Sequence, residues 1–321
     1  MRPELAILIL NYRTTEMTLD CLESLAADVT PTMTVVVVDN ASGDGSADRI
    51  EKGIDERGYG AWARVLRSPV NGGFAAGNNF GMRSVDADAY VLLNSDTIVR
   101  PGVMPGLLDA MRRHPEAGLL APGMVDGEGR FDQSFFREPA PPTELLRAAQ
   151  TGVLTKVLSR FDPILPRSER PIEPDWVGFA CVLVPKHVVQ KVGMLDEGFF
   201  MYFEDIDYCR RVREAGYSIL VLPHLEVVHL QGASSRISAQ GTRQKRAPRY
   251  FYESRARYYA KYYGTHGLWM ANGFWYAGRC LSWVREYLGN RSPHDRENEA
   301  VDIWINALHP MRESSARASK S

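Results

Sequence analysis

Residues 34–38 read Thr-Val-Val-Val-Val, an unbroken run of β-branched side chains that leads into Asp39. Because polar and apolar residues do not alternate, the run is typical of a strand covered on both faces of a parallel sheet. Short apolar runs alternate with amphipathic stretches around it. The expected strands are 5–10, 34–38, 63–66, 89–93 and 119–121, and the expected helices are 15–27, 44–56, 73–84 and about 102–114. This strict alternation predicts an α/β fold with a mainly parallel sheet and right-handed crossovers.

The pattern changes after this alternating part. Pro139, Pro141 and Pro142 open a region that predicts a loop-rich insert at about 137–174, around one helix over 143–158. The next block predicts a strand over 176–184, a short helix, a helix that starts at Glu204, and strands near 219–222 and 227–229. From residue 245 the pattern is helical and aromatic, and we expect 311–321 to be a disordered tail.

The composition is that of a folded protein, with 321 residues, 45% hydrophobic and 24% charged. A formal net charge of −1 argues against nucleic acid as a partner of the whole molecule. The cysteines form no CxxC pair, and we expect buried, reduced thiols in a cytoplasmic protein. They are Cys21, Cys181, Cys209 and Cys280. The apolar run 5–10 stops at Asn11, unlike a secretion signal.

Polar side chains follow four strand positions. They are Asn11-Tyr12-Arg13, Asp39-Asn40, Asn71 and Asn94-Ser95-Asp96. Ligands of parallel α/β sheets bind beyond the carboxyl ends of the strands, where these residues would meet. Four strand ends that present Asn or Asp to one edge are harder to explain by chance than any one of them.

Asp39 and the Gly-rich loop that begins at Asn71 carry groups that could bind a nucleotide. The Asp39 carboxylate could accept the imide N–H of uracil or thymine, with Asn11 and Tyr12 along the base and ribose. The alternative is that Asp39 caps the turn after it. Residues 71–79 read Asn-Gly-Gly-Phe-Ala-Ala-Gly-Asn-Asn, whose backbone N–H groups could face a diphosphate. The loop lacks the Walker lysine and the GxGxxG spacing, so a loop-to-helix turn without a ligand is equally compatible.

Asp96 and His229 are the candidate metal ligands. A diphosphate leaving group needs its charge neutralised, commonly by a divalent cation held on carboxylate oxygen. Asp96 could supply one ligand, although a plain Asp turn is the better explanation when it is considered alone. His229 ends an expected strand, and a lone histidine is more often structural. Paired in space with Asp96, it becomes a candidate second ligand.

Glu204 and Asp205 give the strongest local signal. Residues 199–211 read Phe-Phe-Met-Tyr-Phe-Glu-Asp-Ile-Asp-Tyr-Cys-Arg-Arg, so an apolar run delivers two adjacent carboxylates to a helix start. Apolar neighbours raise the pKa of a carboxyl group, which suits a general base for a sugar hydroxyl. Helix capping competes with this interpretation. It explains Asp205 or Asp207 but not the aromatic approach to them.

Taken in order over residues 4–235, these motifs resemble the family 2 glycosyltransferases, specifically the rhamnosyltransferase-like branch that builds bacterial surface polysaccharides. They are Ile9-Leu-Asn-Tyr12, Asp39-Asn-Ala-Ser-Gly-Asp-Gly-Ser46, Asn71 to Asn78, Leu93-Asn-Ser-Asp96, the 199–211 block, and His229 before the Gly-Ala-Ser-Ser of 232–235. The resemblance implies a GT-A fold with a Rossmann-like, mainly parallel sheet, Mg²⁺ or Mn²⁺ as cofactor, and one in-line displacement that inverts the anomeric carbon.

The resemblance also implies residue roles. Asp39 would meet the base, Asp96 would be the metal-binding Asp of the DxD-type motif, and His229 would be a further metal ligand. Asp205 would be the general base, with Glu204 next in rank. Trp176 and Gly178 open the segment that lines the acceptor pocket in relatives. The other donor-site residues are Asn11, Tyr12, Arg13, Asn40, Gly73, Asn78, Asn94 and Ser95.

The chain departs from the family pattern at two places. Asn94 replaces the first Asp of the DxD pattern, which leaves fewer carboxylates for the metal. The usual Ser-Gly-Ala after the tryptophan reads Val177-Gly-Phe-Ala180, which puts an acceptor role there in doubt.

On this basis 1–235 would be the catalytic domain, with a nucleotide-binding half over 1–122 and an acceptor and catalytic half over 123–235. The branch favours dTDP-rhamnose, with UDP- and GDP-linked donors open, and a saccharide or lipid-linked acceptor. A non-catalytic carbohydrate- or lipid-binding module is one alternative. Another α/β nucleotide-sugar enzyme is the second, but it would need a Gly-rich loop with a basic residue directly after the first strand.

The remaining segment, 236–310, is expected to be a helical, basic and aromatic extension. Its first part carries eight cations against one acid, Glu253, which points to an anionic partner. The cations are Arg236, Arg243, Lys245, Arg246, Arg249, Arg255, Arg257 and Lys261. Residues 267–284 form a largely apolar run that Asn272 and Arg279 interrupt. This pattern fits a peripheral contact with the anionic inner leaflet of the plasma membrane. A homodimer interface, or packing on the catalytic domain, is equally compatible.

Overall fold

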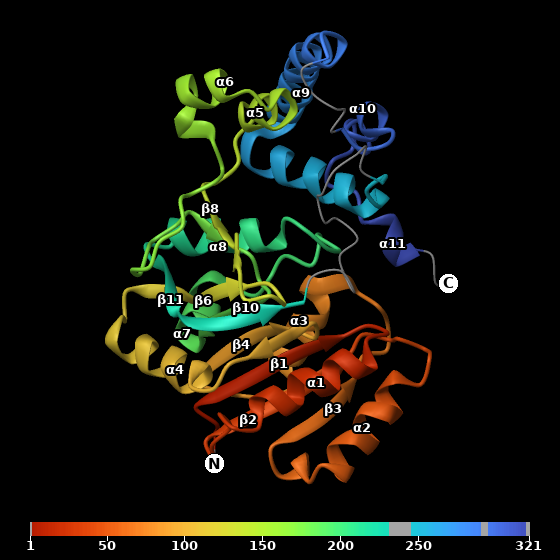
Figure 1. Cartoon of the computed structure of the whole chain (residues 1–321). Helices are drawn as coiled ribbons and strands as arrows, with labels where there is room; N and C mark the ends of the chain where they lie inside the picture. The colour runs from red at the N-terminus through yellow and green to blue at the C-terminus, as the bar shows by residue number, and fades with distance from the viewer. Residues whose placement is uncertain (1, 231–244, 290–294, 319–321) are drawn as a thin grey trace. The chain divides into compact units, whose positions relative to one another are not determined.

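The computed structural model describes residues 2–230, 245–289 and 295–318 (Figure 1). The chain forms two compact units. The sheet unit holds Met1–Phe135, Pro166–Glu197 and Asp205–Ser235, and the helical unit holds Phe136–Leu165, Gly198–Glu204 and Arg236–Ser321. The expected motif at 232–235 and the cations Arg236 and Arg243 lie outside the described residues.

The described strands of the sheet unit form a nine-stranded mixed sheet in the order β3-β2-β1-β4-β10-β6-β11-β5, with β7 paired to β6. Neighbours from β3 to β4 are parallel, as are β6 and β11, and the other pairings are antiparallel. The bounds are β1 Leu5–Asn11, β2 Met33–Asp39, β3 Ala63–Arg67, β4 Ala89–Asn94, β5 Thr97–Val99, β6 Ala117–Val125, β7 Phe131–Asp132, β10 Cys181–Pro185 and β11 Ser218–His229. Two short strands, β8 (Phe135–Phe136) and β9 (Trp176–Val177), lie outside this sheet.

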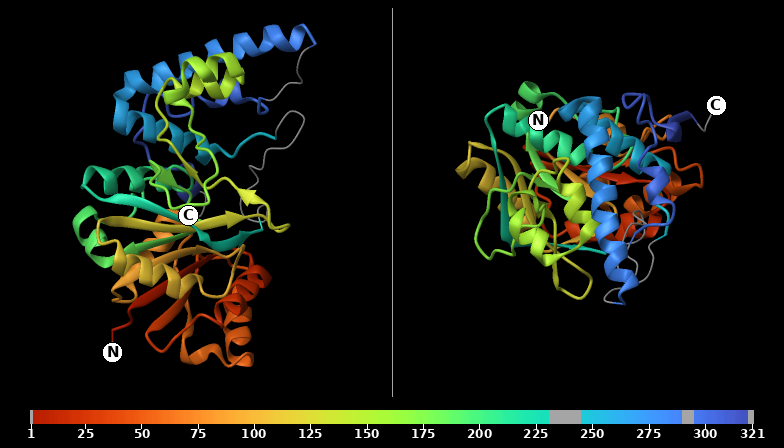
Figure 2. Two further views of the ribbon diagram at one scale, coloured as in Figure 1. Left: turned by 60° about the vertical axis from the view of Figure 1, so that its left-hand side comes forward. Right: turned by 90° about the horizontal axis from the view of Figure 1, so that it is seen from above.

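Helices cover both faces of the parallel part of the sheet (Figures 1 and 2). They are α1 Thr15–Leu25, α2 Ser46–Glu56, α3 Gly73–Arg83 and α4 Val103–Arg113; α7 Lys186–Val192 and α8 Glu204–Glu214 come later in the chain. Ile9 and Val37 pack into the core cluster that contains Leu22 of α1 and Ile50 of α2. On the opposite face Gly81 of α3 lies against Val38. The valine run of β2 is fully buried, which confirms the prediction of a strand covered on both faces.

The parallel register brings the predicted polar strand ends to one edge. Leu10 of β1 pairs with Asn94 of β4, and Asn11 pairs with Asp39 of β2. Because the strands run in the same direction and end level with one another, residues from three separate motifs become neighbours.

Three predicted elements differ in the structure. The single helix expected over 143–158 is α5 (Thr143–Ala149) and α6 (Gly152–Val157), because Gln150 adopts a left-handed conformation with φ of 46°. The strand expected over 176–184 is interrupted between β9 and β10. The two strands expected near 219–222 and 227–229 are one strand, β11, with an irregularity between Leu222 and Glu226.

The helical unit is built around α9 (Arg249–Tyr287), which Gly264 breaks at a φ of 69°. It also contains α5, α6, α10 (Glu299–Asp302) and α11 (Ser315–Ala318). Its core packs Tyr252, Trp275 and Ile303 together. Residues 136–165, which include most of the insert expected at about 137–174 in the catalytic domain, group with this unit, whereas 166–174 belong to the sheet unit. None of the helices within the described ranges has the length and apolar content needed to cross a membrane.

Two further expectations about side chains and order need correction. The predicted disordered tail contains α11, where Glu253 accepts hydrogen bonds from Ser314 and Ser315 and so fixes the chain. Cys280 is exposed, whereas the other three cysteines are buried as expected, because Cys280 lies on the outer side of α9.

Candidate active site

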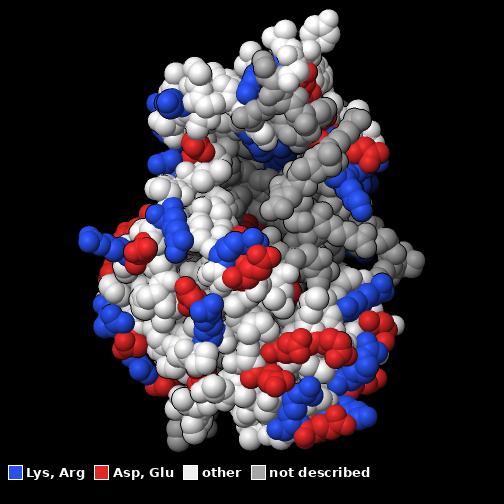
Figure 3. All heavy atoms as spheres, in the orientation of Figure 1, with Lys and Arg blue, Asp and Glu red and all other residues white. Residues whose placement is uncertain are grey.

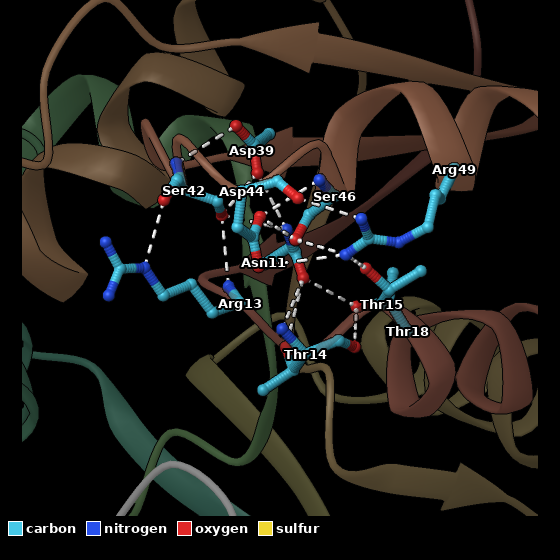
Figure 4. Close-up of polar contacts among 10 residues, drawn as sticks. All are labelled: Asn11, Arg13, Thr14, Thr15, Thr18, Asp39, Ser42, Asp44, Ser46 and Arg49. Atoms are coloured by element: carbon cyan, nitrogen blue, oxygen red, sulfur yellow. Dashed lines mark hydrogen bonds and ion pairs between the residues drawn. The ribbon is translucent and has the colours of Figure 1, made fainter.

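Asn11 is the centre of a hydrogen-bond network at the edge formed by β1 and β2 (Figure 4). Its amide nitrogen donates to Asp39 Oδ1 (2.7 Å) and to Ser42 Oγ (3.2 Å). Its amide oxygen accepts from the Thr14 backbone N–H and from the hydroxyls of Thr14 and Thr18. The side chain is fully buried, so Asn11 holds the start of α1 and the end of β2 in a fixed relation.

Asp39 caps the turn that follows β2, which was one of the two roles considered for it. Its Oδ1 accepts from the Ser42 hydroxyl at 2.6 Å, and its Oδ2 accepts from the Ser42 backbone N–H at 3.2 Å. A carboxylate oxygen can accept more than one hydrogen bond, so capping leaves acceptor capacity on Oδ2. The turn therefore fixes the direction of the carboxylate at the strand edge.

Tyr12 and Arg13 are the exposed members of this edge. Arg13 has a φ of 61°, a left-handed conformation that is uncommon for a residue other than glycine. Two hydrogen bonds to Ser42 hold Arg13 in this conformation. The Ser42 hydroxyl accepts from the Arg13 backbone N–H, and the Ser42 carbonyl accepts from Nε of Arg13, both at 3.0 Å. The guanidinium lies 5.2 Å from the centre of the Tyr12 ring. Strained, exposed residues of this kind are found at ligand sites more often than elsewhere.

The Gly-rich loop is braced by Asn40. Its amide nitrogen donates to Asn71 Oδ1 (3.0 Å) and to the Gly73 carbonyl (3.1 Å). Gly73 begins α3 at a φ of 84°, which favours glycine. Asn78 is buried and donates to the Phe74 carbonyl within the helix. The loop is therefore a rigid entry to a helix N-terminus, as an anion site requires.

Asp96 and His229 meet across β5 and β11. His229 pairs with Thr97 in the antiparallel register, and its Nε2 lies 3.5 Å from Asp96 Oδ1. Asp96 is 1% exposed. Ser95 contacts the Thr14 hydroxyl at 2.9 Å, and the Asn94 carbonyl accepts from Thr97. The turn after β4 thus connects the proposed metal ligands to the Asn11 network.

Asp132 on β7 is a site residue that the sequence did not reveal. Its Oδ2 lies 3.7 Å from Nδ1 of His229, on the other side of the imidazole from Asp96. Burial of the ring opposes its protonation, but the two carboxylates outweigh this effect and raise the pKa of His229 to about 9. Within the described ranges, no group of three His, Cys, Asp or Glu side chains is arranged to hold a metal ion.

Glu204 and Asp205 begin α8 directly after a strained backbone. Tyr202 and Phe203 have φ values of 68° and 67°, two successive left-handed conformations at non-glycine residues. Burial raises the pKa of Asp205 to about 6. Glu204 is buried, and Asp207 forms an ion pair with Arg211 at 2.9 Å, which assigns Asp207 a structural role. No sequence signal marks the strain, because neither residue is a glycine.

Trp176 and Gly178 lie at the interruption between β9 and β10. Trp176 is partly exposed, and the Gly178 backbone N–H donates to the Ser134 carbonyl at 2.8 Å. The departure at 177–180 from the usual Ser-Gly-Ala thus coincides with the break in the expected strand.

Comparison with known proteins agrees with the motifs. A sequence model described as "Glycosyltransferase like family 2" matches residues 3–247. The chain is 29% identical over 232 residues to the N-acetylglucosaminyl-diphospho-decaprenol L-rhamnosyltransferase of Mycobacterium tuberculosis, which covers 67% of this chain and 72% of that protein.

Solved structures with a similar fold include TarS residues 1–349 from S. aureus in complex with UDP-GlcNAc, with a TM-score of 0.54 and 19% identity over 97% of this chain and 80% of that one. A mannosyltransferase from Pyrobaculum calidifontis in complex with GDP-Man and Mn²⁺ gives a TM-score of 0.54 and 13% identity over 97% and 86%. At such identities the likeness concerns the fold alone, and it confirms the predicted GT-A fold.

Proposed function

Because the chain belongs to family 2 of the glycosyltransferases, in its rhamnosyltransferase-like branch, we propose that it transfers a sugar from a nucleotide-sugar donor in one metal-dependent displacement that inverts the anomeric carbon. The observation that carries the proposal is the Asp96–His229 pair, which the turn after β4 links to the Asn11–Asp39 network. Each part alone has a structural explanation. Together at one sheet edge, they would supply the hydrogen-bonding and metal-binding groups that a nucleoside diphosphate requires.

Asp96 and His229 would hold the cation, Mg²⁺ or Mn²⁺. Carboxylate oxygen suits both ions, and imidazole nitrogen is a common ligand of transition metals. Asp132 stands where a carboxylate commonly orients a metal-bound histidine. When bound, the cation would neutralise charge that develops on the leaving diphosphate. Asn94 would act as a hydrogen-bonding neighbour rather than a ligand.

The donor would lie along the carboxyl ends of β1 and β2. We assign the base to Asp39 and Tyr12, and the diphosphate to Arg13, Ser95 and the start of α3 at Gly73. Asn11, Asn40 and Asn78 support these groups from buried positions. We propose dTDP-rhamnose as the donor, because the curated relative is named as an L-rhamnosyltransferase.

Asp205 would be the general base. With a pKa of about 6 its carboxylate is ionised at neutral pH, yet it is basic enough to take a proton from an acceptor hydroxyl. Glu204 is the second candidate for this role. The acceptor would be a lipid-linked saccharide near Trp176 and Gly178, since the relative's name specifies a diphospho-decaprenol carrier.

Consumption of dTDP-rhamnose, UDP-sugars and GDP-sugars by the full chain, each with and without Mn²⁺, tests the proposal. We expect metal-dependent turnover of dTDP-rhamnose that Asp96→Asn abolishes. Asp205→Asn should still bind dTDP but transfer no sugar. The matched control is Glu128→Gln, a carboxylate on an exposed hairpin of the same unit, which should retain activity. If no donor is consumed although dTDP binds, a non-catalytic binding module is the better description.

A further inference from the structure

The second part of α9, over 265–287, reverses the usual arrangement of an amphipathic helix. Its inner side buries polar groups: Asn272 donates to the Ile303 carbonyl, and Arg279 is paired with Glu286 and Asp295. Its outer side carries no charge from Trp269 to Leu288. The exposed residues there are Trp269, Met270, Gly273, Ala277, Cys280, Leu281, Trp283, Val284, Tyr287 and Leu288. These positions recur every three or four residues, so they form one continuous stripe.

The segment after α10 adds to this stripe. The Trp269 indole donates to the Ala307 carbonyl, and the Trp304 indole donates to the Tyr276 hydroxyl, both at 3.2 Å. These hydrogen bonds hold residues 300–308 beside the first turns of the stripe. Val301, Trp304, Leu308 and Met311 are exposed there, with Leu308 at 76%. We call the two sets together the apolar face.

Exposed apolar side chains are concentrated in the helical unit. It contains 14 of the 17 large hydrophobic residues that are exposed in the described part of the chain, although the sheet unit is the longer of the two. Figure 3 shows uncharged side chains over much of the visible face of the helical unit, and charges of both signs over the sheet unit. Apolar patches of this extent mark an interaction surface.

Net charge distinguishes between possible occupants of this surface. The helical unit has 19 of the 38 Lys and Arg residues but 11 of the 39 Asp and Glu residues, a net charge of +8, which leaves −9 for the sheet unit. A dimer joined through two helical units would bring two charges of +8 together. An anionic bilayer would attract the same unit, while its interface accommodates Trp and Tyr side chains.

We propose that the apolar face docks on the surface of an anionic phospholipid membrane. The inner side of α9 is packed against α5 and residue 303, so the helix would lie along the membrane surface with only its outer side inserted. The inference deepens the proposed function, because a lipid-linked acceptor would be presented at that surface. Membrane binding itself does not depend on which donor or acceptor is used.

Flotation of the full chain with vesicles tests the proposal, using phosphatidylcholine alone or mixed equally with phosphatidylglycerol. We expect binding to the anionic vesicles that 0.5 M salt weakens. The double variant Leu281→Glu/Val284→Glu should lower vesicle affinity by about tenfold or more, because it places two charges in the inserted stripe. The matched control Val70→Glu alters an exposed valine of the sheet unit and should bind as the unchanged chain does.

Three outcomes would overturn the proposal. The first is that the chain binds neither kind of vesicle. The second is that the double variant keeps its melting temperature and binds vesicles as well as the control does, and the third is that the chain sediments as a dimer that the double variant converts to a monomer. Donor consumption in the absence of membranes is measured on the same proteins. A loss of vesicle binding with intact donor consumption separates this proposal from the proposed function.

Discussion

In the proposed metal site, Asp132 would orient the candidate ligand His229 without contacting the cation itself. It faces Nδ1 of His229, while Asp96 faces Nε2. We predict that Asp132→Asn lowers the His229 pKa from about 9 toward 6.5, because one of the two carboxylates that stabilise the imidazolium is lost. An NMR titration of the imidazole in the metal-free protein measures this directly.

The same substitution should weaken Mn²⁺ binding by about 10- to 100-fold at pH 8.5, since the ring loses the group that orients it. The loss should be smaller at pH 7, where the lower pKa frees the imidazole from its proton. Calorimetry at both pH values makes the comparison, with Glu128→Gln as the control. Unchanged Mn²⁺ affinity at both values would assign Asp132 a purely structural role.

Asp205 should set the acidic limb of the pH profile. Below its pKa of about 6 the carboxyl is protonated and cannot accept a proton, so kcat/KM should fall as pH drops through 6. Asp205→Asn should remove this limb and reduce kcat by about 10²- to 10⁴-fold.

Ionisation of Asp205 should have the opposite effect on folding stability: as pH rises, activity increases while the contribution of Asp205 to stability decreases. A carboxyl whose pKa is raised in the folded chain binds its proton more tightly there than in the unfolded chain. Its ionisation therefore costs folding free energy as pH rises from about 4 through 6. The melting temperature of Asp205→Asn at pH 8 should equal or exceed that of the unchanged chain, and a clear decrease would argue that Asp205 is mainly a helix cap.

At the scale of elements, α5 and α9 pack closely because residue 278 has no side chain. A Cβ at Gly278 would overlap the Leu145 carbonyl oxygen and approach the Ala149 nitrogen to 2.9 Å, and both atoms belong to the backbone of α5. We predict that Gly278→Ala destabilises the protein by about 1–3 kcal/mol, as overpacking does.

Gly273 provides the matched control for this prediction. It lies five residues earlier on the same helix, and a Cβ there would meet no atom within 4 Å. Gly273→Ala should stabilise by about 0.5–1 kcal/mol through helix propensity alone. Urea denaturation of both variants makes the comparison. Equal effects in the same direction would contradict the packing explanation.

At the scale of the whole molecule, the nucleotide should stabilise the fold much more strongly when the metal is bound with it. A ligand at 100 times its Kd adds about 2.7 kcal/mol to the stability of the state that binds it. We expect dTDP with Mn²⁺ to raise the melting temperature, and EDTA to remove most of that gain. Asp96→Asn should show the response to dTDP alone. A full response to dTDP in EDTA would mean that the nucleotide site does not use a metal.

Much of the fold could be predicted from the sequence because the patterns that indicate it are local. The valine run, the alternation of strands and helices, and the polar residues after each strand depend on neighbours within a few positions. The parallel register then brings Asn11, Asp39 and Asn94 together, as the strand-end argument predicted. The break at Gln150 escaped prediction, because a left-handed residue other than glycine leaves no mark in the sequence.

What the sequence determined by itself was the set of residues that could form a nucleotide-sugar site and the edge at which they would gather. The tertiary structure decided the rest. Asp132 reaches His229 only through the pairing of β7, and residues 136–165 join the helical unit only through packing against α9. The net charges of +8 on the helical unit and −9 on the sheet unit likewise appear only when segments that are distant in the sequence are grouped into these units. These features depend on contacts between residues far apart in the chain, which no local pattern specifies.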